Sequence, residues 1–363
     1  MPTAGVMPKS AAMSRDFHLW LRSRRAAARK SRLAASSYAA ACSPGPAGLS
    51  HAYPFDPRYG HDLQSLCAIE PPLPPEGFAA FWQERYQRAL RIDPQPRLGP
   101  SQHRLQGFCV FDLEYASTEG FPVRGWLLWP TSRVARRGFV LGHGYGGIES
   151  PPSDLPCDDA VYVVPCFRGL SRSRRWPISD DPNYHVLHDI HLRDRYIIGG
   201  CVDDLWTGVT ALLQVAPHTA GHVGYMGISL GGGVGALGLA WDARIERAHL
   251  NVPTFGNQAL RLVLPTVGSG VAVQAFAQRH PQVVETLAFY DAAVAARFIQ
   301  QPMHVAAALF DPAVAPPGQF SVFNAIGGRK DLFVLTAGHF DFPQRVQEER
   351  RLQAALRVFF APL

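Results

Sequence analysis

Short apolar runs alternate with segments of helical periodicity along most of the chain. The runs predict strands over 138–141, 160–165, 222–226, 245–252, 303–310 and 331–336. Helices are predicted over 197–215, from about 230 to 239, within a helical cover over 258–299, and over 320–326 and 344–360. Nearly continuous apolar strands separated by helices are typical of a parallel sheet covered on both faces. The predicted fold class is therefore α/β.

The part of the chain before these elements shows a different pattern. The proline-rich segment 71–75 leads into an amphipathic helix predicted over 76–92, whose aromatic positions we interpret as core packing. Two segments of alternating polarity, 106–116 and 120–130, follow it. They predict an antiparallel hairpin that opens the sheet.

The motif Gly227-Ile228-Ser229-Leu230-Gly231 lies between a predicted strand and a glycine-rich helix. In this context the serine occupies a strained strand-to-helix turn, and the flanking glycines leave room for the close strand and helix. Ser229 is therefore the candidate nucleophile. The backbone N–H of Leu230, at the helix N-terminus, is a candidate donor to an oxyanion. The alternative is a glycine-rich turn with an idle serine.

A serine nucleophile needs a base and an orienting acid, which follow the serine in the order acid, then histidine, in the α/β-hydrolase arrangement. The histidines downstream of Ser229 are His249, His280, His304 and His339. His339 is favoured because it follows a predicted strand and a turn, at the carboxyl edge of the sheet. We expect the other three to be packed or solvated.

Asp311 directly follows the predicted strand 303–310 and is the expected orienting carboxylate. The alternative is a turn residue, because Asp-Pro commonly begins turns. Asp291 is a weaker candidate within a helical pattern, and Asp341 follows the base instead of preceding it.

Two loops carry further candidate residues. In the loop 142–147 the backbone N–H of Tyr145 is the expected second oxyanion donor, and His143 is interpreted as structural. The polar loop 171–193 contains three histidines at three-residue spacing: His185, His188 and His191. No secure helix puts them on one face, so a solvated loop is favoured over a metal site. We expect no metal and no organic cofactor.

Composition is that of an ordinary globular protein: 363 residues, of which 47% are hydrophobic and 18% charged. No apolar run reaches the length of a membrane span, about 18 residues. Residues 1–50 contain eight basic residues and one acid, so the net charge of +6 is +7 in this segment and −1 in residues 51–363. We expect a poorly ordered basic extension over 1–50 and a single domain over 51–363, with no case for nucleic-acid binding.

The six cysteines are Cys42, Cys67, Cys109, Cys157, Cys166 and Cys201. None forms a C-x-x-C motif, and several lie in apolar runs. This pattern favours free, mostly buried thiols and a reducing compartment, and hence a cytoplasmic location.

From Pro71 to Leu363 the chain resembles the acetyl xylan esterase and cephalosporin C deacetylase family of α/β-hydrolases. The matching motifs, in order, are Phe78-Ala79-Ala80-Phe81-Trp82, His143-Gly144-Tyr145-Gly146-Gly147, Arg168-Gly169, the segment 227–232, Asp311 with Pro316-Pro317 and Asn324, and Gly338-His339. The resemblance implies the α/β-hydrolase fold, a mostly parallel sheet with helices on both faces, and a possible homo-oligomer.

The chain departs from the family pattern at three positions. Leu170, Leu230 and Phe340 stand where the family has polar residues. We interpret them as a less polar rim around the site, which favours acyl esters other than acetylated sugars.

The resulting hypothesis is a serine carboxylic-ester hydrolase with a Ser229-His339-Asp311 triad. It would deacetylate acetylated saccharides or similar small acetyl esters. A thioesterase or peptidase on the same fold, or a weakly catalytic ligand-binding member, stays open as an alternative.

Overall fold

The computed structural model describes residues 49–131 and 134–363. The basic extension expected over 1–50 lies outside the described residues, except for its last two. Among the described residues, a single nine-stranded sheet has the strand order β1-β2-β3-β5-β4-β6-β7-β8-β9. The strands are β1 Arg97–Pro100, β2 Phe108–Ala116, β3 Pro122–Pro130, β4 Arg137–Gly142, β5 Ala160–Pro165, β6 Val223–Ile228, β7 Arg247–Asn251, β8 Met303–Ala308 and β9 Lys330–Leu335.

The sheet is antiparallel at one edge and parallel through the rest. Strands β1, β2 and β3 pair antiparallel, and β3 pairs antiparallel with β5. From β5 to β9 every pairing is parallel. The hairpin and the parallel sheet predicted from the sequence are therefore both confirmed. Strand β1 was missed because its sequence, Arg-Leu-Gly-Pro, contains no apolar run.

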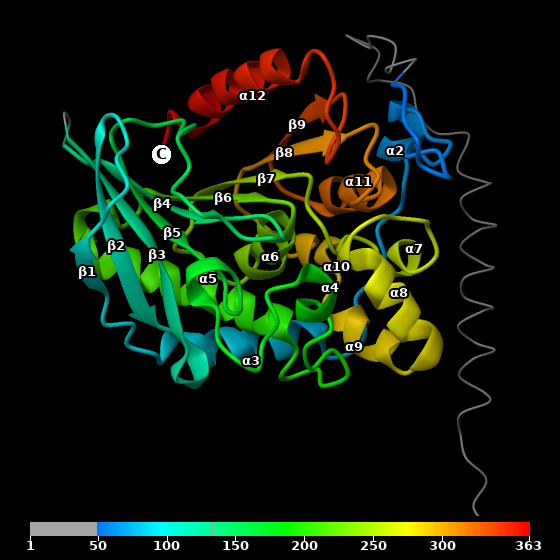
Figure 1. The fold of residues 1–363 in the computed structure, drawn as a ribbon, viewed down its shortest axis with the longest axis horizontal. Helices are drawn as coiled ribbons and strands as arrows, with labels where there is room; N and C mark the ends of the chain where they lie inside the picture. The colour runs from blue at the N-terminus through cyan, green and yellow to red at the C-terminus, as the bar shows by residue number, and fades with distance from the viewer. Residues whose placement is uncertain (1–48, 132–133) are drawn as a thin grey trace, which may run out of the picture. The chain divides into compact units, whose positions relative to one another are not determined.

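Helices lie on both faces of the sheet (Figure 1). They are α2 Leu63–Cys67, α3 Phe78–Leu90, α4 Pro182–His185, α5 Ile197–Val215, α6 Leu230–Leu239, α7 Gln258–Arg261, α8 Ser269–Arg279, α9 Val283–Phe289, α10 Ala292–Ala296, α11 Pro316–Ala325 and α12 Arg345–Phe360. The larger apolar core contains side chains of α3, α5 and α6 on one face, and a second core packs α12 against the other. No helix of the described residues is both long and apolar enough to cross a membrane.

Three of the described cysteines are buried, namely Cys157, Cys166 and Cys201. Burial raises the pKa of the Cys157 and Cys166 thiols to about 11, so both are protonated at neutral pH. Cys67 and Cys109 are exposed, and Cys42 lies outside the described residues.

Two histidines face each other on adjacent central strands. His249 on β7 is in register with His304 on β8, and their Nδ1 atoms lie 3.0 Å apart. Both side chains are buried, and His304 packs against Phe333 and Phe359. Burial lowers the pKa of His249 to about 3 and that of His304 to about 4; Asp331 opposes the second shift weakly. The pair is therefore neutral in the folded protein at neutral pH.

This pair predicts a pH-dependent free energy of unfolding. Between about pH 6.5 and 4 the unfolded chain binds protons at both positions and the folded chain does not, so stability falls as the pH falls. The slope is up to about 1.4 kcal/mol per pH unit for each histidine. Urea unfolding at several pH values measures it. The slope of unfolding free energy against pH should be shallower in the H249Q/H304Q variant than in wild type, and unchanged in the exposed-site control H280Q. Equal slopes in wild type and both variants would contradict the prediction.

Candidate active site

Ser229 occupies the tight turn between β6 and α6. Its φ of 53° and ψ of −108° lie outside the regions that L-residues favour, so the surrounding structure must hold the backbone there. The Ser229 N–H donates to the carbonyl of Asn251 on β7, and the Gly231 N–H donates to the carbonyl of His143. The donor–acceptor distance is 2.9 Å in each case. A side chain on Gly231 would overlap the backbone of Gly142. The glycine therefore lets α6 pack directly against β4.

The structure brings together the three side chains expected to form the triad. His339 Nε2 lies 2.9 Å from Ser229 Oγ, and its Nδ1 lies 2.8 Å from Asp311 Oδ2. Asp311 follows β8 and His339 follows β9, so all three residues come from the carboxyl ends of parallel strands. With Nδ1 donating to the carboxylate, Nε2 is free to accept the Ser229 proton.

Asp311 is fully buried and held by several donors. One carboxylate oxygen accepts the N–H groups of Ala313 and Val314, each at 2.9 Å. The other accepts both His339 Nδ1–H and the Gln319 side-chain amide, which lies 2.9 Å away. The Asp-Pro turn considered as an alternative therefore exists alongside the contact with histidine.

Gln319 was not predicted from the sequence. This residue of α11 is fully buried; its Nε2 also donates to the Val314 carbonyl and its Oε1 accepts the Ala308 N–H. It joins the end of β8 to the turn that carries Asp311. The only sequence signal is a glutamine eight residues after the aspartate, within a short helix, and this is not specific.

The other two carboxylates considered for this role lie elsewhere. Asp291 accepts the backbone N–H groups of Ala293 and Val294, so it caps α10 instead of lying within a helix. Asp341 is 88% exposed and pairs with Arg345. Neither contacts His339.

Asp311 controls the basicity of His339. Burial by itself lowers the pKa of His339, but the hydrogen bond and the charge of Asp311 outweigh this effect and raise the pKa above the ordinary 6.5. The imidazole is therefore a stronger base than a free histidine and stabilises a positive charge when it takes a proton.

The two expected oxyanion donors flank Ser229. Leu230 is the first residue of α6, and Tyr145 lies in the loop after β4, which passes close to the Ser229 side chain at Gly144. Neither N–H donates to another described residue. Both remain candidate donors to an oxyanion, and the Leu230 side chain is fully buried.

His143 has a structural position, as predicted. It is buried, and its Nε2 accepts the Phe167 N–H at 2.9 Å. Burial lowers its pKa to about 4, so the ring is neutral and supports the loop after β5.

The polar loop 171–193 differs from the prediction. His185 is fully buried instead of solvated: its Nε2 hydrogen-bonds the Arg168 carbonyl at 2.9 Å, and its Nδ1 lies 3.3 Å from the Tyr145 hydroxyl. A polar contact hidden under the loop cannot be seen in the sequence. His188 is partly exposed and His191 is exposed. Among the described residues, no group of acidic, histidine or cysteine side chains could hold a metal ion.

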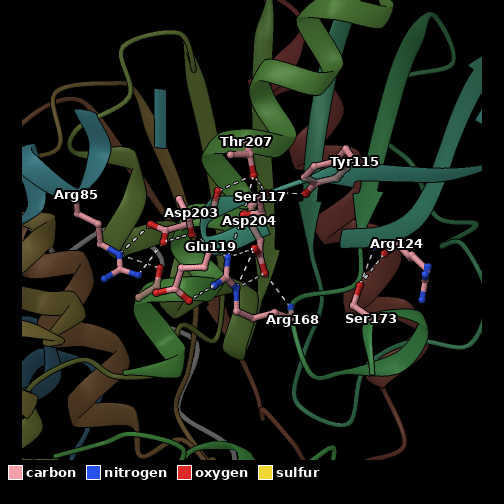
Figure 2. Close-up of polar contacts among 12 residues, drawn as sticks. Arg85, Tyr115, Ser117, Glu119, Arg124, Arg168, Ser173, Asp203, Asp204 and Thr207 are labelled. Carbon is pink, nitrogen blue, oxygen red and sulfur yellow. Dashed lines mark hydrogen bonds and ion pairs between the residues drawn. The ribbon is translucent and has the colours of Figure 1, made fainter. Parts of the chain in front are cut away.

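The Arg168 carbonyl is positioned by a buried polar network (Figure 2). The Arg168 guanidinium donates to Asp204 at 2.6 Å, and the Arg168 N–H donates to the same carboxylate at 2.8 Å. Asp204 lies on α5. The residue before it, Asp203, forms an ion pair with Arg85 of α3, with a nitrogen–oxygen distance of 2.8 Å. Two buried ion pairs thus tie the loop after β5 to helices α5 and α3.

A cavity of about 410 Å³ opens onto Ser229 and His339. The side chains that line it include those of Tyr145, Ile228, Thr254, Arg261, Val267 and Val314. As expected, the segment after β7 contributes much of the wall.

The interpretation of Leu170, Leu230 and Phe340 as an apolar rim is wrong. Leu170 and Leu230 are buried side chains, and Phe340 packs on Phe310 and Tyr53. None of the three side chains lines the cavity. These replacements therefore alter packing behind the site, and the rim consists of other residues.

Comparisons with known proteins agree with this geometry. The acetyl xylan esterase family model matches residues 70–357. The structure superposes on an acetyl xylan esterase from Paenibacillus sp. R4 with a TM-score of 0.70 and 19% identity, covering 81% of this chain and 99% of that one. Acetyl xylan esterase 1 from Thermoanaerobacterium sp. JW/SL YS485 superposes with a TM-score of 0.69 and 18% identity, covering 83% of this chain and 99% of that one.

A more distant neighbour, the Pyrococcus horikoshii acylaminoacyl peptidase, has a TM-score of 0.55 and 13% identity, covering 71% of this chain and 42% of that one. At these identities the structural neighbours show the α/β-hydrolase fold. The family model covers most of the chain, and by it this chain belongs to the acetyl xylan esterase family and is a serine carboxylic-ester hydrolase.

Proposed function

We propose that this enzyme deacetylates small acetyl esters, including those of acetylated saccharides, with Ser229 as nucleophile. The observation that carries the proposal is the hydrogen-bonded chain from Ser229 through His339 to Asp311, of which Ser229 and His339 line a cavity. The acetyl preference is supported by membership of the acetyl xylan esterase family.

In the proposed mechanism His339 Nε2 takes the proton of Ser229 Oγ as the oxygen attacks the ester carbonyl. Asp311 stabilises the resulting imidazolium and fixes its orientation. The N–H groups of Tyr145 and Leu230 donate to the tetrahedral oxyanion, and each such donor is typically worth about 3 kcal/mol. His339 then protonates the leaving alcohol, and a water molecule repeats the sequence on the acyl-enzyme.

Substrate choice tests the proposal directly. Hydrolysis of 4-nitrophenyl acetate, butyrate and octanoate should show the highest kcat/KM for acetate, and S229A should lose at least about 10⁴-fold of this activity. The exposed-site control S153A should retain it. A preference for octanoate would remove the acetyl assignment, and turnover confined to thioesters or peptide amides would replace the esterase with one of its alternatives.

The pH dependence tests the roles of His339 and Asp311. Because His339 must be neutral to act as a base and its pKa is raised, kcat/KM should fall with decreasing pH through an apparent pKa above 6.5. In D311N the charge is lost while the burial remains, so this pKa should fall below 6.5 and kcat should drop about 10⁴-fold. An unchanged acidic limb in D311N would assign the limb to another group.

Gln319 should act as a positioning residue. Its replacement in Q319L removes one donor to Asp311, and we expect kcat to fall about ten-fold, because a hydrogen bond to a charged group contributes about 1.5–3 kcal/mol. KM for 4-nitrophenyl acetate should change little.

The matched control for Q319L is Q301L. The Gln301 side-chain amide likewise donates two hydrogen bonds, but to the backbone carbonyls of Leu239 and Asp242, and it touches no triad residue. Thermal melts of both variants measure the shared loss of stability. Equal kcat values in Q319L and Q301L would show that Gln319 has only a structural role.

A further inference from the structure

Arg261 brings a positive charge to the cavity that contains Ser229 and His339. It is the last residue of α7, and it lines both this cavity and a smaller adjoining recess of about 30 Å³. Arginine stays protonated at any physiological pH, so the site contains a permanent cation.

No carboxylate of the described residues forms an ion pair with Arg261. The contacts of its guanidinium are a long hydrogen bond of 3.5 Å to the neutral Gln258 side chain and the face of the Phe255 ring, 5.3 Å from Cζ. An exposed arginine would be solvated by water, but burial lowers the pKa of Arg261. By its exposed surface Arg261 is half-buried, so the cation is partly shielded from water and has no matching carboxylate.

Two buried arginines, Arg85 and Arg168, and two half-buried ones, Arg244 and Arg297, have polar partners among the described residues. Arg85, Arg168 and Arg244 each bond a carboxylate within 2.8 Å. Arg297 lacks a carboxylate but donates to the carbonyls of Pro71 and Pro72. Arg261 differs from all of them in lining the cavity.

The acid that acts on Arg261 electrostatically is Asp291, and its oxygens are occupied. They accept the backbone N–H groups of Asn257, Gln258, Ala293 and Val294. Burial raises the pKa of Asp291 to about 6, which reduces its average charge near neutral pH. Asp291 therefore organises the backbone around α7 and leaves the Arg261 fork without a bidentate partner.

The neighbourhood of Arg261 contains further donors. The hydroxyls of Tyr145 and Tyr196 lie near the guanidinium, and that of Tyr145 also lies 3.3 Å from His185 Nδ1. Tyr196 is buried, and its hydroxyl has no hydrogen-bond partner among the described residues. A half-buried cation that lines the cavity and has only one long hydrogen bond to a neutral amide is suited to an anionic ligand group.

We propose that Arg261 determines substrate specificity by binding a carboxylate carried by the ester substrate. This proposal rests on the proposed function of the same cavity. The planar guanidinium fork matches a carboxylate bidentately, and the low-polarity surroundings strengthen the interaction. The preferred substrate is then a small ester with a second, ionised carboxyl group. Arg261 does not take part in the bond-breaking step.

Two pairs of substrates test this role and locate the carboxylate. The first pair, 5-acetoxy-2-nitrobenzoate and its methyl ester, places the charge on the alcohol part. The second, 4-nitrophenyl succinate and its methyl ester, places it on the acyl part. In the wild-type enzyme the charged member of at least one pair should have the higher kcat/KM, mainly through a lower KM.

In R261Q the ratio of kcat/KM for the charged member to that for the neutral member should fall at least about ten-fold, as expected for loss of a charged hydrogen bond. R261K, which retains the charge but not the fork, should restore part of this ratio. The matched control R279Q removes an exposed arginine of α8 that donates to the Ala275 carbonyl, and it should keep the wild-type ratio. A ratio in R261Q equal to that of wild type for both pairs would overturn the proposal.

A binding measurement separates failure of this proposal from failure of the proposed function. Calorimetric titration of S229A with 5-hydroxy-2-nitrobenzoate and with succinate reports carboxylate binding without turnover. We expect one or both of these carboxylates to bind S229A more tightly than they bind S229A/R261Q, by about ten-fold or more. Binding without hydrolysis of any ester would retain the role of Arg261 and reject the esterase mechanism. Equal affinities in the two variants, or no binding to either, would reject the role of Arg261. Melting curves show whether R261Q is folded.

Discussion

The site depends on the close approach of α6 to the ends of β4 and β6. Glycine at 142, 227 and 231 removes the side chains that would separate these backbones, so the helix begins directly behind Ser229. The strained Ser229 backbone is maintained because its N–H is bonded to β7. Leu230, the first residue of α6, directly follows Ser229 in this arrangement. One packing constraint thus sets the positions of both the proposed nucleophile and the proposed oxyanion donor.

A buried ion pair helps to fix the loops around this arrangement. Arg168 and Asp204 fix the loop after β5, and the Arg168 carbonyl then holds His185 under Tyr145. Removing one partner of such a buried pair is costly, typically about 3–5 kcal/mol, because the other charge is left unpaired. The loop with the proposed Tyr145 donor is therefore tied to α5 by polar side-chain contacts, whereas the start of α6 is placed by close backbone packing and backbone hydrogen bonds.

Much of the fold could be predicted because apolar periodicity is local. The helix expected over 197–215 is α5, and the strands around the elbow lie within a few residues of their predicted positions. Ser229, Asp311 and His339 could be chosen because chain order and strand ends restrict the options. Gln319 and the buried position of His185 could not, since each depends on contacts with elements that the sequence does not place. For the same reason the three apolar replacements were assigned to a rim when they lie elsewhere.

Arg261 shows the same limit in energetic terms. A sequence shows an arginine but not whether an acid reaches it, and most buried arginines here do have one. A shielded, unpaired guanidinium destabilises the free protein, since its desolvation is not repaid by a partner. Residues 51–363 have a net charge of only −1, so the cation does not follow from an excess of positive charge in the body of the protein. Arg261 lines the cavity, so a bound anionic ligand can offset the free-energy cost of its unpaired charge. This location connects the unpaired charge with substrate choice.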